Sequence, residues 1–65
     1  MKIKINGNDV LTSASDIAGL AEEQGVRRNG TAIALDGKVI PKGEWAATPL
    51  VEGSSVLIIN AAFGG

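Results

Sequence analysis

Few of the residue types that carry out chemistry in proteins occur in this chain, which has no Cys and no His among its 65 residues. It therefore has no thiol nucleophile, none of the usual soft metal ligands and no side chain that titrates near neutral pH. We expect no turnover of its own, no bound cofactor and no metal. The group best suited to take part in a reaction is then the C-terminal carboxylate of Gly65, which Gly64 precedes.

The last three residues, Phe63, Gly64 and Gly65, form the candidate reactive segment. Because Gly makes up about 7% of residues in proteins, a terminal pair arises by chance in about 0.5% of chains. Glycine has no Cβ atom, so this pair can enter a narrow channel and present its carboxylate to an ATP-using enzyme. Phe63 either folds back over an edge of the domain or anchors a partner that grips the tail. A frayed end without function is the alternative for the whole segment.

Charge and hydropathy exclude several classes of protein. Six Lys and Arg residues against seven Asp and Glu give a net charge of -1, which is not the basic footprint of a nucleic-acid-binding protein. The apolar run at residues 56–59 is far shorter than the about 20 residues that a membrane helix needs. The first residues alternate Lys with Ile instead of forming the apolar stretch of a signal peptide. We expect a cytoplasmic protein that binds neither nucleic acid nor membranes.

The chain opens with a predicted β-hairpin. Residues 1–5 alternate apolar and charged side chains, which places Ile3 and Ile5 on the buried face of a strand. Asn6-Gly7 supplies the two positive-φ positions of a tight hairpin turn, and a second strand follows over residues 8–12.

A short helix is predicted after this hairpin. Ser13 and Asp16 have the spacing of a capping box, with Ser15 as an alternative cap. Gly25 has the position of a left-handed residue that ends a helix. Gly19, inside the helix, is expected to allow close approach to a sheet. The buried face consists of three apolar residues at helical spacing, Ile17, Leu20 and Ala21.

The second half of the chain predicts another hairpin and a final strand. Strands over residues 31–35 and 38–40 flank Asp36-Gly37, a second hairpin turn. Residues 42–53 are expected to form a loop with one helical turn, and residues 56–60 the last strand.

The order hairpin, helix, hairpin, loop and strand predicts one fold. The strands on both sides of the helix must share a sheet to bury one core, so the last strand is expected beside the first, in parallel. This is an α+β fold of the β-grasp, or ubiquitin-like, type: a mixed sheet of four to five strands packed on one helix. Residues 1–60 are expected to form this domain. Residues 61–65 are expected to be a flexible tail, because the segment has too little side-chain surface to offset the entropy of ordering it.

The alternation of the last strand predicts a surface for partners. If Val56 and Ile58 face the helix, Leu57 and Ile59 lie on the open face of the sheet, where apolar residues often mark an interaction site. Two alternatives are that the Trp45 loop or self-association covers them, and that the strand has the opposite phase. Trp45 itself is interpreted as a lid over the edge of the core.

Several segments together resemble one family over essentially the whole chain. They are Ile3-Lys4-Ile5-Asn6-Gly7, the hairpin at residues 32–42, the stretch Ile40-Pro41-Lys42-Gly43-Glu44-Trp45, Leu50-Val51-Glu52-Gly53 and Gly64-Gly65. On these segments the sequence resembles the sulfur carrier proteins of thiamine biosynthesis, the ThiS family. Gly53-Ser54 departs from the Gly-Asp that this family usually has. The small subunit of molybdopterin synthase is a sister family, but it usually has a Pro-Pro segment before its diglycine, and residues 60–63 hold no Pro.

The resemblance implies a chemical role for the C-terminus. An adenylyltransferase of the ThiF type would use ATP to activate the Gly65 carboxylate, and a persulfide donor would then convert it to a thiocarboxylate. A thiazole synthase of the ThiG type would receive the sulfur. Gly65 with Gly64 is then the reactive terminus, and Phe63, Leu57 and Ile59 are the candidate partner-binding residues. The alternatives are a molybdopterin-type sulfur carrier, a ubiquitin-like modifier and an inert β-grasp interaction module.

Overall fold

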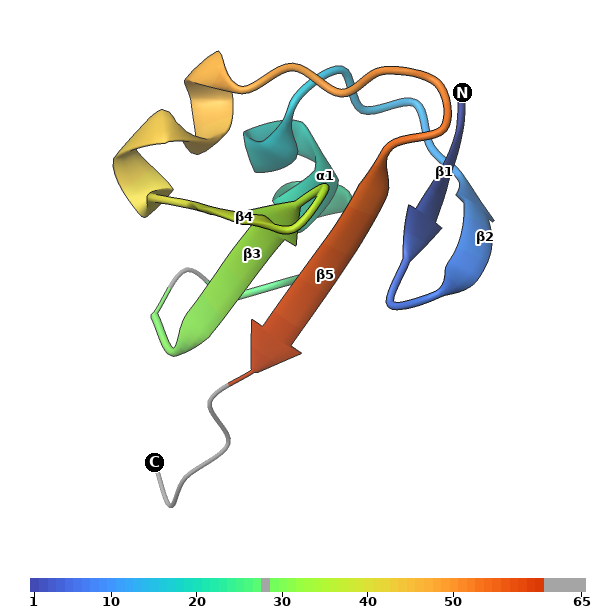
Figure 1. Ribbon diagram of the computed structural model, residues 1–65. Helices are drawn as coiled ribbons and strands as arrows, with labels where there is room; N and C mark the ends of the chain where they lie inside the picture. Colours follow the sequence, from blue (N-terminus) through green and yellow to red (C-terminus); the bar gives the residue numbers. More distant parts are fainter. Residues whose placement is uncertain (28, 61–65) are drawn as a thin grey trace.

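The computed structural model describes residues 1–27 and 29–60 of the chain. Within these residues the backbone forms five strands, an α-helix and a 3-10 helix (Figure 1). In chain order these elements are β1 (Lys2–Ile5), β2 (Asn8–Leu11), α1 (Ile17–Glu23), β3 (Thr31–Leu35), β4 (Lys38–Ile40), the 3-10 helix η1 (Lys42–Ala47) and β5 (Ser55–Asn60).

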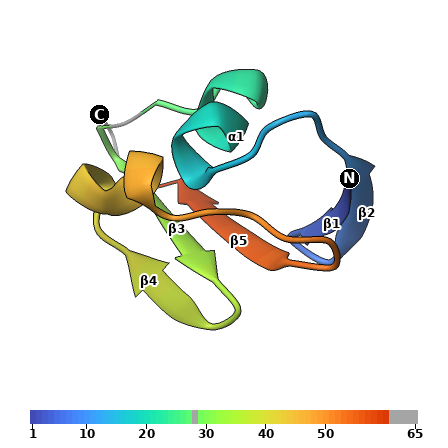
Figure 2. The ribbon, with the colours of Figure 1, turned by 90° about the horizontal axis from the view of Figure 1, so that it is seen from above.

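The strands form one mixed sheet in the order β2-β1-β5-β3-β4. β5 lies in its centre, parallel to β1, as the sequence predicts, and antiparallel to β3. Seen from above, α1 and η1 lie on the same side of this sheet (Figure 2). One helix packed on a mixed sheet with a central last strand is the β-grasp arrangement, so the predicted fold class is confirmed.

Both hairpins turn where their sequences predict. Asn6 and Gly7 have φ angles of 51° and 85°, and Asp36 and Gly37 have φ angles of 50° and 86°. Two consecutive positive φ values match the twist of the flanking strands, and Asn, Asp and Gly are the residues that adopt them most readily.

The cap of α1 differs from the prediction. Asp16 is the N-cap, and its Oδ1 accepts a hydrogen bond from the Gly19 N–H at 2.7 Å, whereas Ser13 and Ser15 do not cap the helix. The Ser15 carbonyl instead accepts from the Leu50 N–H at 2.9 Å, which holds the segment before the helix against the loop after η1. The Ser13 N–H and hydroxyl both donate to the Glu23 carboxylate. Tertiary contacts therefore engage Ser13 and Ser15 elsewhere, and Asp16, which the capping-box prediction placed inside the helix, is the cap.

Gly19 approaches this cap and not the sheet, which corrects the second expectation for the helix. A Cβ atom at Gly19 would lie 3.2 Å from Asp16 Oδ1 and 3.5 Å from Ala14 Cβ. At the other end, Gly25 has a φ of 68°, and the Val26 N–H donates to the Ala21 carbonyl at 2.8 Å. The predicted left-handed helix end is therefore confirmed.

The core lies between α1, η1 and one face of the sheet. Trp45 is 2% exposed, and its indole Nε1 donates to the Ile40 carbonyl at 2.9 Å, so the residue belongs to the core, as its interpretation as a lid requires. No helix within the described residues has the length and apolar character needed to cross a membrane. The other large, fully buried side chains are Ile3, Ile17, Leu20, Ile33 and Val56.

Candidate functional site

β5 leads directly to the candidate reactive segment. It ends at Asn60, the last residue that the structure describes. Phe63, Gly64 and Gly65 lie outside the described residues, and so does the expected flexible tail over residues 61–65. The part of the site that the structure does describe is therefore the strand that precedes the tail and its surroundings.

The side chains of β5 alternate between the two faces of the sheet with the predicted phase. Val56 is 2% exposed and Ile58 packs against the core, whereas Leu57 and Ile59 are 48% and 47% exposed. η1 contacts α1 on the core side, so the Trp45 loop does not cover these two residues. The opposite phase and coverage by the Trp45 loop are therefore wrong, and coverage by self-association stays an alternative prediction.

Neighbouring strands extend this exposed surface. Leu57 is paired with Ala34, and Ala34 is paired with Val39 on its other side. Paired residues share a face, so Val39, which is 62% exposed, lies on the same face as Leu57. Ile59 is paired with Ala32 one step further along. We call the surface of Val39, Leu57 and Ile59 the open-face patch; it borders a groove of about 550 Å³ that also reaches both hairpin turns.

Val39 was missed when the site was predicted from sequence, although a signal for it exists. A two-residue turn at Asp36-Gly37 fixes the register of the second hairpin and thereby pairs Val39 with Ala34. The alternation of the strand over residues 31–35 then places Val39 on the face of the sheet that points away from the core. The register of the hairpin therefore predicts that Val39 belongs to the open-face patch.

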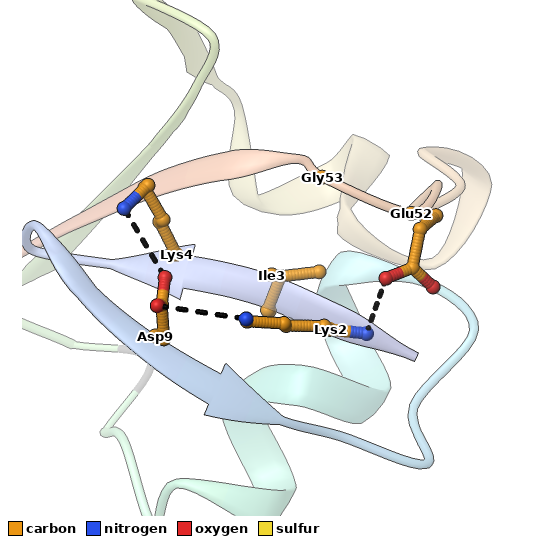
Figure 3. A pocket seen from close by; sticks show the side chains of 6 residues that line it. All are labelled: Lys2, Ile3, Lys4, Asp9, Glu52 and Gly53. Carbon is orange, nitrogen blue, oxygen red and sulfur yellow. Dashed lines mark hydrogen bonds and ion pairs between the residues drawn. The ribbon is translucent and has the colours of Figure 1, made fainter.

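The other half of the open face, on β1 and β2, carries charged residues and one exposed apolar residue, Leu11. Lys4 Nζ lies 3.1 Å from Asp9 Oδ1, and Lys2 Nζ lies 3.7 Å from Asp9 Oδ2 (Figure 3). The hydrogen bond and charge of Lys4, and then the charge of Lys2, hold the pKa of the Asp9 carboxyl below its usual value. The Lys2 N–H donates to Glu52 Oε2 at 3.0 Å. Because two cations face two anions here and all are exposed, this half of the face has little net charge.

A metal centre is not formed by the part of the chain that the structure describes. No group of three or more acidic side chains within it is arranged to hold an ion. The described surface offers an apolar docking area beside a balanced polar area, and both adjoin the strand that leads to Gly64 and Gly65. Such a surface is of the kind that can bind a partner.

Comparison with known proteins places this site in a family. The sequence model of the ThiS family matches residues 3–65, which include Gly64-Gly65. The chain belongs to the ThiS family. ThiS-family proteins are small sulfur carriers of thiamine biosynthesis and not catalysts, and this coarse role applies to the chain.

Solved structures agree with the fold of this ThiS-family chain. It resembles the crystal structure of a thiamine biosynthesis protein (ThiS) from Geobacter metallireducens, with 20% identity and a TM-score of 0.84 over 100% of both chains. It also resembles an NMR solution structure of a thiamine biosynthesis protein from the same organism, with 20% identity and a TM-score of 0.82, over 100% of this chain and 88% of that one. These likenesses show the same fold. A search of curated proteins finds no match.

Proposed function

We propose that the Gly65 carboxylate is the sulfur-carrying group. One of its oxygens attacks the α-phosphorus of ATP on an adenylyltransferase of the ThiF type and releases pyrophosphate, which leaves an acyl adenylate. A persulfide on a partner cysteine then attacks the acyl carbon and expels AMP. A thiol cleaves the resulting acyl disulfide and is itself oxidised to a disulfide, which leaves the thiocarboxylate. A thiazole synthase of the ThiG type takes this sulfur for the thiazole ring.

The observation that carries this proposal is the extent of the family match, which includes Gly64-Gly65. The residue composition agrees with it, because the chain has neither the Cys that would carry a persulfide nor a His that titrates near neutral pH. Glycines at both terminal positions suit a narrow channel, since neither carries a Cβ atom. ATP is used by the partner and not bound by the carrier. A reaction that consumes ATP also favours a cytoplasmic location.

The open-face patch is the proposed docking surface for the adenylyltransferase. Leu57 and Ile59 are half exposed on the strand that leads to the reactive segment, and Val39 extends their surface. An apolar surface next to the tail allows one partner to hold the domain and the carboxylate together. Phe63 is proposed as a further contact for the same partner, nearer the chain end.

Intact-mass measurement after incubation with ATP, a persulfide donor and a thiamine-pathway adenylyltransferase tests this function. The expected product carries one sulfur in place of one oxygen, and mass fragmentation locates the change at Gly65. A lysine conjugate would instead identify a ubiquitin-like modifier. Transfer of the sulfur only to a molybdopterin precursor would identify the sister pathway. No change in mass would contradict the proposal and leave an inert interaction module.

A further inference from the structure

The second half of β5 has a neighbouring strand on one side only. β3 is paired with β5 from Val56 to Asn60, whereas β1 is paired only with Ser55 and Val56. The last backbone hydrogen bond on the β1 side runs from the Asn6 N–H to the Val56 carbonyl, at 2.9 Å. Beyond Val56 the backbone groups on this side therefore need a partner other than a strand.

The side chain of Asn6 is that partner. Its Oδ1 accepts from the Ile58 N–H at 2.8 Å, and its Nδ2 donates to the Ile58 carbonyl at 3.3 Å. One carboxamide thus satisfies both backbone groups of Ile58, which a parallel strand would satisfy through two different residues. β5 is held on this side for two residues after its last pairing with β1.

The first turn residue of the other hairpin makes a related contact at the opposite end of β5. The Asp36 N–H donates to the Ser55 carbonyl at 2.8 Å, and the Ser55 N–H donates to Asp36 Oδ1 at 3.0 Å. Because the Asp36 N–H already satisfies the Ser55 carbonyl, the Asp36 side chain needs only to accept a hydrogen bond from the Ser55 N–H, and a carboxylate can do this. At Ile58 both groups are open, and one side chain can satisfy both only if it donates as well as accepts.

We infer that Asn6 is a positioning residue that orders the end of β5 before a partner binds. Leu57 and Ile59 lie on either side of Ile58, so the two β5 residues of the open-face patch depend on this contact. This inference rests on the proposed function. If the contact is lost, the strand end is ordered in only a fraction of the free molecules. The apparent Kd for the partner then equals the intrinsic Kd divided by that fraction, so binding becomes weaker.

Three variants test this role. Asn6→Gly removes both hydrogen bonds and keeps the turn, because Gly readily adopts the φ of 51° found there. Asn6→Asp keeps an acceptor for the Ile58 N–H but loses the donor to its carbonyl. Asp36→Gly is the matched control, since it removes a side-chain contact to β5 from the same turn position, at a φ of 50°, but at the other end of the strand.

Two readouts are measured for each variant. The first is hydrogen exchange at the Ile59 amide, which faces β3 because residues 55, 57 and 59 alternate with those facing β1. Asn6→Gly is expected to accelerate it about 5- to 150-fold, as the loss of two ordinary hydrogen bonds implies. The second is pyrophosphate release by the adenylyltransferase, for which the KM of the carrier is expected to rise about twofold or more while kcat stays unchanged. Asn6→Asp is expected to lie between Asn6→Gly and the unmodified chain.

The outcomes separate this inference from the proposed function. Faster exchange and a higher KM in Asn6→Gly, with neither in Asp36→Gly, support the positioning role. Equal values for the two Gly variants would overturn it and leave the sulfur-carrier function intact. If the unmodified chain supports no pyrophosphate release, the proposed function fails and the inference fails with it.

Discussion

The two faces of the sheet differ in what their apolar residues do, although both are built from the same strands. On the face toward α1, Val56 and Ile33 are 2% and 0% exposed and pack into one cluster. On the opposite face, Leu57 is 48% exposed, although it follows Val56 directly in the chain. Burial of the first pair stabilises the fold, whereas exposure of Leu57 leaves apolar area in water that only a partner can cover. Adjacent residues of one strand can therefore serve stability and binding separately.

A substitution on the core face is expected to have the largest effect on the folded state. Ile33→Ala is expected to reduce the free energy of unfolding by about 2–5 kcal/mol, because it leaves a cavity beneath α1. A domain of this size has a total stability of roughly 3–5 kcal/mol, so the variant should be largely unfolded. Urea unfolding followed by circular dichroism measures this. A loss similar to that of a surface variant would contradict the proposed division between the two faces.

Changes in the reactive segment are expected to lower activity strongly and to leave the stability of the fold unchanged. Removal of Gly65 ends the chain one residue short of the ATP phosphate, and attack requires the reacting atoms to approach to about 3–3.5 Å. Thiocarboxylate formation is expected to fall on the order of 100-fold, with an unchanged thermal midpoint. Gly64→Val should lower it too, because a β-branched side chain must enter a channel that suits bare backbone. Full conversion of the shortened chain would rule out the proposed mechanism.

Charge placed on the open-face patch is expected to weaken docking by a smaller amount. Leu57→Glu or Ile59→Glu should reduce binding to the adenylyltransferase about tenfold. The thermal midpoint should change little, because both residues are already half exposed. Leu11→Glu is the matched control: Leu11 is 80% exposed and is paired with Lys2 on the polar half of the same face. Equal weakening by all three variants would indicate a general charge effect instead of a defined patch.

The smallest effect is expected from the acidic group that joins β2 to α1. Glu23 accepts hydrogen bonds from the hydroxyls of Thr12 and Ser13 and from the Ser13 N–H. The Thr12 bond contributes most to lowering the pKa of the Glu23 carboxyl below its ordinary value of 4.5. Because the folded-state pKa is depressed, the contribution to stability is present above pH 4.5 and is lost as the pH falls through the lower folded-state value.

Thermal unfolding at several pH values measures this contribution. The midpoint of the unmodified chain should fall as the pH is lowered from 4.5, and the fall should be shallower in Glu23→Gln. Thr12→Val should flatten the dependence in a similar way, because it removes the main donor to the carboxylate. An unchanged slope in Glu23→Gln would show that other groups account for the dependence on pH.

The sequence predicts most of the fold because its signals are local. The turns at Asn6-Gly7 and Asp36-Gly37 fix two hairpins, and the alternation of residues 56–59 fixes the phase of β5. The cap of α1 could not be chosen in this way. Ser13, Ser15 and Asp16 are all suitable residue types, and contacts with Glu23 and Leu50, distant in sequence, decide between them.

The candidate site was predicted less completely than the fold. The alternation of β5 predicts the correct face for Leu57 and Ile59, whereas the position of Val39 depends on the register of the second hairpin. The contact between Asn6 and Ile58 joins residues 52 positions apart, so no local pattern announces it. The roles of Phe63, Gly64 and Gly65 stay predictions.

The burial of Trp45 determines what optical spectroscopy can detect in this protein. The chain has one Trp and no Tyr, so its intrinsic fluorescence comes almost entirely from Trp45. That indole is enclosed on the core side, hydrogen-bonded to Ile40 and separated from the open-face patch by the sheet. Its emission should therefore shift on unfolding and stay constant when a partner covers Leu57 and Ile59. A dye attached near the patch, read together with Trp45, would record docking and unfolding in separate channels of one experiment.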